Sequence, residues 1–192
     1  MIDFNFENDA EPTKGSLLIS EPFLNDQYFS RSVIFLCDHN EQGSFGFVLN
    51  NYIDAELHDI VGELPDIQTR ISVGGPVDTS NLFFVHALGD EVPDSLEIID
   101  GLYIGGRFEV VKSLIAENPE KAKKIRFFIG YSGWDAEQLQ SEMEEKSWIV
   151  LNSVKQSTVL DTKNDDIWQS IMRDLGGKFK VMSEFPKNPS DN

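Results

Sequence analysis

The sequence is poor in cysteine, in positive charge and in long apolar runs. Cys37 is the one cysteine, so no disulfide can form within the chain. Lysine and arginine together number 16 against 33 aspartate and glutamate residues, which gives a formal net charge of −17. Such a surface repels phosphate backbones and anionic lipid headgroups, because both are themselves negatively charged. We therefore expect no direct nucleic-acid partner and no membrane partner.

Targeting signals are also missing. The chain contains no run of about 18 apolar residues, the length that indicates a membrane-spanning helix. Its first residues, MIDFNFENDAEP, lack the basic segment followed by an apolar one that a secretory signal has. The sequence therefore predicts a cytoplasmic protein.

The chain does contain enough apolar surface for one core. Hydrophobic residues make up 40% of its 192 residues and aromatic residues 11%. A chain of this size usually folds as one domain, and neither a repeat nor a low-complexity linker divides it. We expect a domain at residues 15–185, preceded by an arm (1–14) that Phe4 and Phe6 partly dock, and followed by a loose tail (186–192).

Short apolar runs bounded by turn residues predict about eight or nine strands. They fall at 16–20, 32–39, 45–51, 70–73, 81–88, twice within 96–106, from 125 onward and at 148–151. Apolar residues at helical spacing predict helices at 55–64, at 108–117, after Asp135 and at 164–175. Strands and helices do not alternate strictly, so we expect an α/β protein with a mixed sheet of the α+β type.

Residues 125–148 are the stretch around which the chain is organised. They predict a buried strand, a tight glycine turn and a helix, and joints of this kind often hold ligands. The segment GYSGW invites comparison with the nucleophile elbow G-x-S-x-G, but Trp134 stands where that pattern needs its last glycine. Ser132 is better interpreted as a turn hydroxyl and Asp135 as the cap of the helix. Tyr131 and Trp134 then lie where a pocket or a partner surface could form.

Cys37 and His39 form a second candidate site, since an imidazole can activate a neighbouring thiol. In a strand the two side chains share a face, and Asp38 points to the other. The alternative is that Cys37 is a small buried hydrophobe, as a lone cysteine in an apolar run such as VIFLC commonly is. The three histidines lie far apart without metal-ligand spacing, so we expect no metal site.

Two glycine turns, GGPV (Gly74–Val77) and YIGG (Tyr103–Gly106), could present backbone N–H groups to an anion. Their alternative role is a tight turn between strands. Neither matches a dinucleotide or phosphate-loop pattern, so no cofactor is expected. Arg31 and Arg107 could each clamp a carboxylate or phosphate, or form an internal ion pair. The predicted ligand-binding set is Arg31, Gly74, Gly75, Arg107, Tyr131, Ser132 and Trp134.

Four segments, in this order and at these separations, resemble the YqgE/AlgH family of bacterial proteins. They are GSLLISEPFLNDQYFSRSVIFLCDHNEQGSFGFVLN, GGPV, DGLYIGGRFE and GYSGWDAEQLQSEMEEKSW. The resemblance covers residues 15–148, with a looser match to residue 185. It implies a compact domain with a bifurcated, barrel-like mixed sheet flanked by about four helices. Where the family usually has a glycine before a Gln-Leu pair, this chain has Glu137, so a backbone contact that depends on glycine is in question there.

The resemblance implies a fold more than a function, because the family is largely uncharacterised. One branch carries a label as a transcriptional regulator of exopolysaccharide genes. The net charge of −17 argues against direct DNA contact, as does the lack of a helix-turn-helix pattern with basic residues. We expect a non-enzymatic binding or indirectly regulatory protein with an unknown protein or small-molecule partner. The alternatives are an enzyme or redox protein that uses Cys37 with His39, and a transcriptional regulator as that label says.

Overall fold

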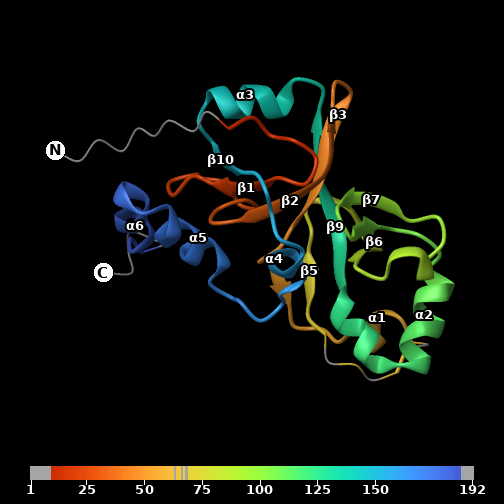
Figure 1. Cartoon of the computed structure of the whole chain (residues 1–192). Helices are drawn as coiled ribbons and strands as arrows, with labels where there is room; N and C mark the ends of the chain where they lie inside the picture. Colours follow the sequence, from red (N-terminus) through yellow and green to blue (C-terminus); the bar gives the residue numbers. More distant parts are fainter. Residues whose placement is uncertain (1–9, 63, 66, 68, 187–192) are drawn as a thin grey trace.

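The computed structural model describes residues 10–62, 64–65, 67 and 69–186. The strands are β1 (Leu17–Ser20), β2 (Val33–Asn40), β3 (Gly43–Val48), β4 (Tyr52–Ile53), β5 (Ile71–Val73), β6 (Val77–His86), β7 (Leu96–Ile99), β8 (Leu102–Ile104), β9 (Ile125–Asp135) and β10 (Trp148–Leu151). The helices are α1 (Leu57–Ile60), α2 (Phe108–Glu117), α3 (Gln138–Glu144), α4 (Gln156–Leu160), α5 (Ile167–Leu175) and α6 (Gly177–Ser183), with 3-10 turns η1 (Gly89–Glu91) and η2 (Pro119–Lys124). Figure 1 shows α3 near one end of β9, and α1 and α2 near the other.

The long strand β9 lies at the centre of a ten-stranded sheet. The main path of the sheet runs β10-β1-β2-β3-β9-β6-β8-β7, and all neighbours along it are antiparallel. Off this path, β5 pairs in parallel with β9 and antiparallel with β4. The sheet is therefore mixed, as the irregular order of strands and helices predicts.

One edge of β9 carries two partners, and this divides the sheet into two branches. Residues 132–135 pair with β3, whereas residues 127–129 pair with β5. The backbone N–H of Val48 donates to the Gly74 carbonyl (2.9 Å), which joins the two branches at the fork. The end strands β10 and β7 are not paired with each other, so the described strands form an open, forked sheet and not a closed barrel.

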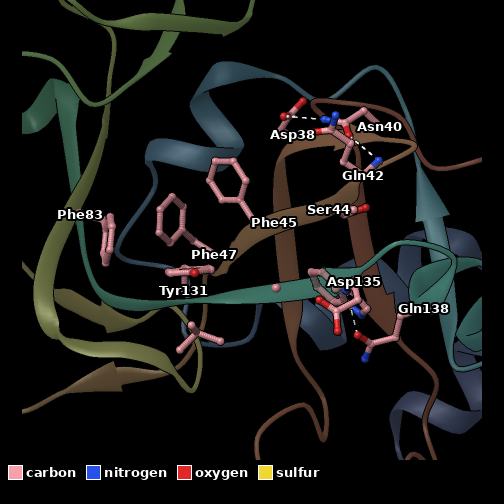
Figure 2. A pocket seen from close by; sticks show the side chains of 14 residues that line it. Asp38, Asn40, Gln42, Ser44, Phe45, Phe47, Phe83, Tyr131, Asp135 and Gln138 are labelled. Carbon is pink, nitrogen blue, oxygen red and sulfur yellow. Dashed lines mark hydrogen bonds between the residues drawn. The ribbon is translucent and has the colours of Figure 1, made fainter.

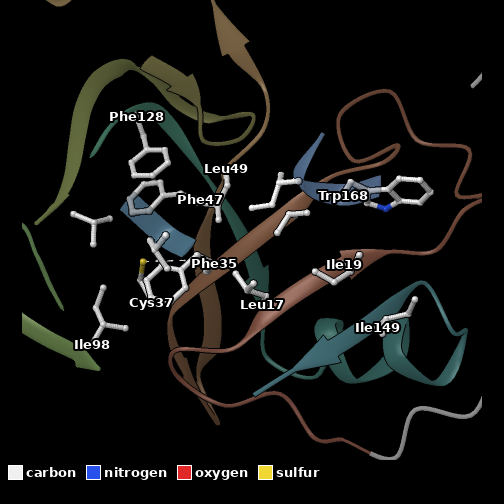
Figure 3. Packing of buried hydrophobic residues seen from close by; sticks show 14 of the residues in the cluster. Leu17, Ile19, Phe35, Cys37, Phe47, Leu49, Ile98, Phe128, Ile149 and Trp168 are labelled. Carbon is white, nitrogen blue, oxygen red and sulfur yellow. Dashed lines mark hydrogen bonds between the residues drawn. The ribbon is translucent and has the colours of Figure 1, made fainter. Parts of the chain in front are cut away.

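Three apolar clusters hold the layers together. The first packs the sheet against the C-terminal helices; Figure 3 shows its members Phe47, Phe128 and Trp168. Phe47 and Phe128 stack with ring centroids 4.4 Å apart. A second cluster packs α1 and α2 against β5, β6 and β9, and a third packs α3 against β1, β2 and β10. Alternation along β1 sends Ile19 into the first cluster and Leu18 into the third, which is why this strand is apolar throughout.

The helices only partly follow the predicted ranges. Helix α2 begins and ends at the predicted residues, whereas α1 covers only four of the residues 55–64 and α5 begins three residues later than predicted. Among the described residues, α4 and α6 were not predicted: the five residues of α4 are too few to show a periodic pattern, and α6 begins at Gly177, in a glycine pair that indicates the end of a helix. None of the described helices has both the length and the apolar character to span a bilayer. The predicted docking of Phe4 and Phe6 lies outside the described residues.

The tight turn predicted at GYSGW is wrong, because β9 continues through this segment to Asp135. Asp135 is also not the cap of α3. The N-cap position belongs to Glu137, whose backbone is left-handed with φ 65°, and Gln138 Oε1 accepts a hydrogen bond from the Asp135 backbone N–H (3.0 Å). Glu137 therefore holds, at the position where the resemblance implies glycine, a conformation that glycine adopts with less strain.

Candidate functional site

A groove of about 710 Å³ lies over β3 and the second half of β9. Its walls come from the β2–β3 hairpin, from β6 and β9, and from the first turn of α3. Figure 2 shows Phe45, Phe47, Phe83 and Tyr131 gathered at one end of this groove; toward the other end lie two groups of polar side chains, Asp38 with Asn40 and Gln42, and Asp135 with Gln138. Its size lies within the range of small-molecule sites in proteins.

The rings of Phe45, Phe83 and Tyr131 form the aromatic end, and the ring of Phe47 lies beneath them. Tyr131 meets Phe45 edge to face, with ring centroids 6.1 Å apart, and meets Phe83 in the same way at 5.6 Å. Phe47 is fully buried and packs edge to face against Phe45 at 6.3 Å. Contacts of this kind fix the orientation of each ring. The aromatic end is therefore formed before any ligand arrives.

The groove follows from the alternation of side chains along β9. Tyr131, Gly133 and Asp135 line it, whereas Ser132 between them is buried on the opposite face. Gly133 is exposed, and a Cβ added there would meet only the ring of Tyr131, at 3.3 Å. The missing side chain at Gly133 thus leaves the space between the aromatic end and the polar end.

The polar end combines the β2–β3 hairpin with the end of β9, which lie together because Gly43 pairs with Asp135. Asn40 Nδ2 donates to Asp38 Oδ2 (3.0 Å), and the Gln42 backbone N–H donates to Asn40 Oδ1 (2.8 Å). Asp135 is exposed, and no other described residue pairs with its carboxylate. Among the described residues that line the groove, none is lysine or arginine. This end of the groove is therefore negatively charged.

The sequence predicts that the side chains of Cys37 and His39 share a face of β2, and this prediction is wrong. The register of β2 against β3 shifts between Leu36 and Asp38, which makes Cys37 the extra residue of a β-bulge. After the bulge Asp38 lines the groove, whereas His39 lies on the other side and its Nδ1 bonds to Ser44 Oγ (2.6 Å). Cys37 is 3% exposed, and burial raises the pKa of its thiol well above the ordinary value. The pair is therefore not arranged as a thiolate and its base.

The residues of the predicted glycine turn lie behind the groove and support β9. Gly74 N–H donates to the Ile129 carbonyl (2.8 Å), and Ser132 Oγ donates to the Gly74 carbonyl (2.9 Å). A Cβ on Gly75 would lie 2.3 Å from the carbonyl carbon of Tyr131. Only glycine allows the chain to approach the strand so closely. Ser132 is fully buried, so its hydroxyl serves this joint.

Trp134 borders the groove, but its indole anchors α3 to the sheet. Its Nε1–H donates to Glu142 Oε2 (2.8 Å), and the Trp148 Nε1–H donates to the same oxygen (2.7 Å). Phe29 stacks on Trp134 with centroids 6.3 Å apart. One carboxylate therefore holds two buried indoles on the face opposite to Tyr131.

The two arginines of the predicted set do not line the groove. Arg31 donates to the Phe185 carbonyl and lies over the ring of Trp168, 5.0 Å from its centroid. Arg107 forms an exposed ion pair with Asp94 (2.7 Å). Both arginines therefore have partners within the chain.

Sequence reasoning missed Arg126, which is fully buried near the start of β9. Its Nη1 donates to the carbonyls of Val159 (2.7 Å) and Asp161 (2.9 Å), and its Nη2 donates to the Leu49 carbonyl and the Tyr52 hydroxyl (3.0 Å). Burial lowers its pKa. The signal was one arginine inside the apolar run IRFFIG, since a buried cation needs acceptors around it. Its partners come from both sides of the fork and from α4, so it ties these segments together.

The open, forked sheet and its helices define a single mixed α/β domain of the α+β type. A model of the AlgH-like family matches residues 17–180, and the chain belongs to this family, as its motifs predict. A UPF0301 protein of Bacteroides fragilis is 44% identical over 190 residues, which cover 96% of this chain and 94% of that protein. A UPF0301 protein of Cytophaga hutchinsonii is 40% identical over 181 residues, covering 94% and 99%.

Two solved structures are similar to this chain. A crystal structure of a protein from Corynebacterium diphtheriae matches with a TM-score of 0.77 at 24% identity, and covers 94% of this chain and 95% of that one. The solution structure of the AlgH protein from Pseudomonas aeruginosa matches with a TM-score of 0.72 at 25% identity, covering 94% and 98%. Both support the fold described above.

Proposed function

We propose that this protein is a cytoplasmic, non-enzymatic binding protein whose ligand occupies the groove over β3 and β9. The observation that supports this is the preformed aromatic end, which Gly133 leaves open toward a polar end. Concave sites with aromatic walls and a few polar groups are typical of ligand binding. Any regulatory role is then indirect and depends on what the groove holds.

The side chains of Cys37, His39 and Ser132 support binding over catalysis. Cys37 is buried with a raised pKa, and His39 lies on the other side of its strand. The Ser132 hydroxyl donates to a backbone carbonyl. None of these three groups points into the groove.

Filling the groove tests this proposal. The variant Gly133→Val adds a side chain between the two ends, and a β-branched residue suits a strand position. We expect a library of small aromatic fragments, screened by ligand-observed NMR, to give hits with the wild type that bind the variant at least about tenfold more weakly.

A matched control is Gly62→Ala, because a Cβ at Gly62 has no neighbour within 4 Å. This control should keep every hit, and circular dichroism should show the same fold for all three proteins. Equal binding by wild type and Gly133→Val, or no hits at all, would refute the groove as the binding site. A gel shift with DNA at low salt would instead favour direct regulation, because low salt gives charge attraction its greatest range.

A further inference from the structure

We propose that the ligand of the groove is a small organic cation, with an apolar or aromatic body that carries one ammonium or guanidinium group. This inference rests on the proposed function and adds the chemical class of the ligand. It follows from three properties of the groove: its charge, its rings and the way in which its carboxylates are already engaged.

Charge selects the sign of the ligand. Asp38 and Asp135 lie at the polar end, and the described lining residues include no basic side chain that could neutralise them. The whole chain adds a formal charge of −17, which attracts cations toward any cleft in its surface. The negative charge disfavours a phosphate or carboxylate ligand here and attracts an ammonium group.

Rings select an organic cation over a bare metal ion. The apolar surface of aromatic rings takes up a hydrocarbon body, which a bare metal ion lacks. Phe45, Phe83 and Tyr131 offer such surface at the end opposite to the carboxylates. Within the described part of the chain, no group of three His, Cys, Asp or Glu residues could hold a metal. The arrangement therefore suits a ligand with an apolar end and a cationic end.

The carboxylates of Asp38 and Asp135 differ in their hydrogen-bond partners. Asp38 already accepts hydrogen bonds from the His39 backbone N–H (3.0 Å) and from Asn40 Nδ2 (3.0 Å). The Asp135 carboxylate has no such partner among the residues with a described position, and its backbone N–H is held by Gln138. Asp135 is thus fixed in the backbone and open at the side chain. We expect it to make the main contact with the cation.

Three probes with one aromatic body and different charge test this inference. They are phenethylammonium, 2-phenylethanol and 3-phenylpropanoate, titrated into the full chain at low salt and followed by two-dimensional NMR. We expect phenethylammonium to bind about threefold to fivefold more tightly than 2-phenylethanol, because its ammonium group adds an ion-pair contact at the polar end. The carboxylate probe should not bind. Raising the salt concentration should weaken the binding of phenethylammonium and leave that of 2-phenylethanol unchanged, because salt screens exposed charge pairs.

The variant Asp135→Asn identifies the partner. It should weaken the binding of phenethylammonium about threefold to fivefold, since exposed ion pairs are of that strength, and leave the affinity for 2-phenylethanol unchanged. Asp174→Asn is the matched control, because it makes the same change in charge at an exposed position on α5, outside the groove. It should leave both affinities unchanged.

The outcomes separate this inference from the function on which it rests. If 2-phenylethanol binds the groove as tightly as phenethylammonium, and Asp135→Asn has no effect, the cation class is wrong while the groove remains a binding site. If no probe shifts the resonances of Tyr131 or Phe45, both proposals fail. The comparison of the three probes on the wild type requires no variant, so it tests the cation class even if a substitution disturbs the fold.

Discussion

Replacing Arg126 by methionine tests whether a buried guanidinium holds the fork of the sheet together. Methionine keeps an unbranched side chain but loses every donor. The Leu49 carbonyl keeps a second hydrogen bond, from Ser72 Oγ at 2.9 Å. The carbonyls of Val159 and Asp161 lose the Arg126 donor. A buried polar group left without a partner costs about 1–3 kcal/mol, which applies to the Val159 carbonyl; the carbonyl of Asp161, an exposed residue, costs less.

Part of this loss is offset, because the variant no longer buries a cation. Arg126 Nε is already buried without a hydrogen-bond partner among the described residues, and burial lowers the pKa of the group, so the guanidinium is held at some cost. We expect a net loss of about 2 kcal/mol in the free energy of unfolding. Urea denaturation followed by circular dichroism measures it.

A second variant, Arg126→Lys, serves as the comparison. It retains the charge, but its single ammonium cannot reproduce the spread of the guanidinium, so we expect an intermediate loss. An Arg126→Met protein within about 1 kcal/mol of the wild type, or more stable than it, would refute the reasoning, since apolar replacement of a buried ion can be favourable. The fork would then be held by its apolar contacts alone.

Four further predictions concern single side chains. Glu142→Ala removes the acceptor of two buried indole N–H groups and should lower stability by about 2–3 kcal/mol in urea denaturation, whereas Glu144→Ala on the same helix should change it little. Glu137→Gly should raise the free energy of unfolding by about 0.5–1 kcal/mol, because glycine adopts the left-handed backbone conformation with less strain. A lower free energy of unfolding would contradict this. Burial lowers the pKa of His86, so the unfolded chain takes up a proton first and stability should fall as the pH drops below about 6.5; an unaltered slope in His86→Gln would count against this. Iodoacetamide should alkylate Cys37 only as fast as the chain opens, and fast labelling with an apparent thiol pKa below about 8.5 would restore the enzyme hypothesis.

The parts of the fold that the sequence predicts correctly are governed by local interactions. Helix α2 shows apolar residues at helical spacing and ends before Pro119. The β7–β8 hairpin turns at Asp100 and Gly101 as predicted, but only Gly101 has a positive φ, so the turn is not of the type I′ that this pair favours. The turn predicted at GYSGW is wrong because the two glycines of this segment indicate a turn locally, whereas pairing with the distant strand β3 keeps it extended.

The candidate site could be predicted only in part, for the same reason. Tyr131 was identified because it lies in the segment that also carries the family resemblance. Phe45, Phe83 and Asp38 come from three other strands, β3, β6 and β2, and only the strand order β2-β3-β9-β6 brings them to the same groove as Tyr131. The bulge at Cys37 reverses the faces after it, and one sequence offers no local sign of the reversal.

The central place of β9 has a consequence for how the chain is made. Translation delivers eight strands before β9, yet β3, β5 and β6 all wait for a partner that is complete only at Asp135. Until then their edges stay open, and open strand edges invite pairing with other chains. Nascent chains that stop before Ile125 should therefore expose the β9-facing edges of these strands and depend on chaperones to prevent pairing with other chains. The sheet can assemble only when about two thirds of the chain has left the ribosome.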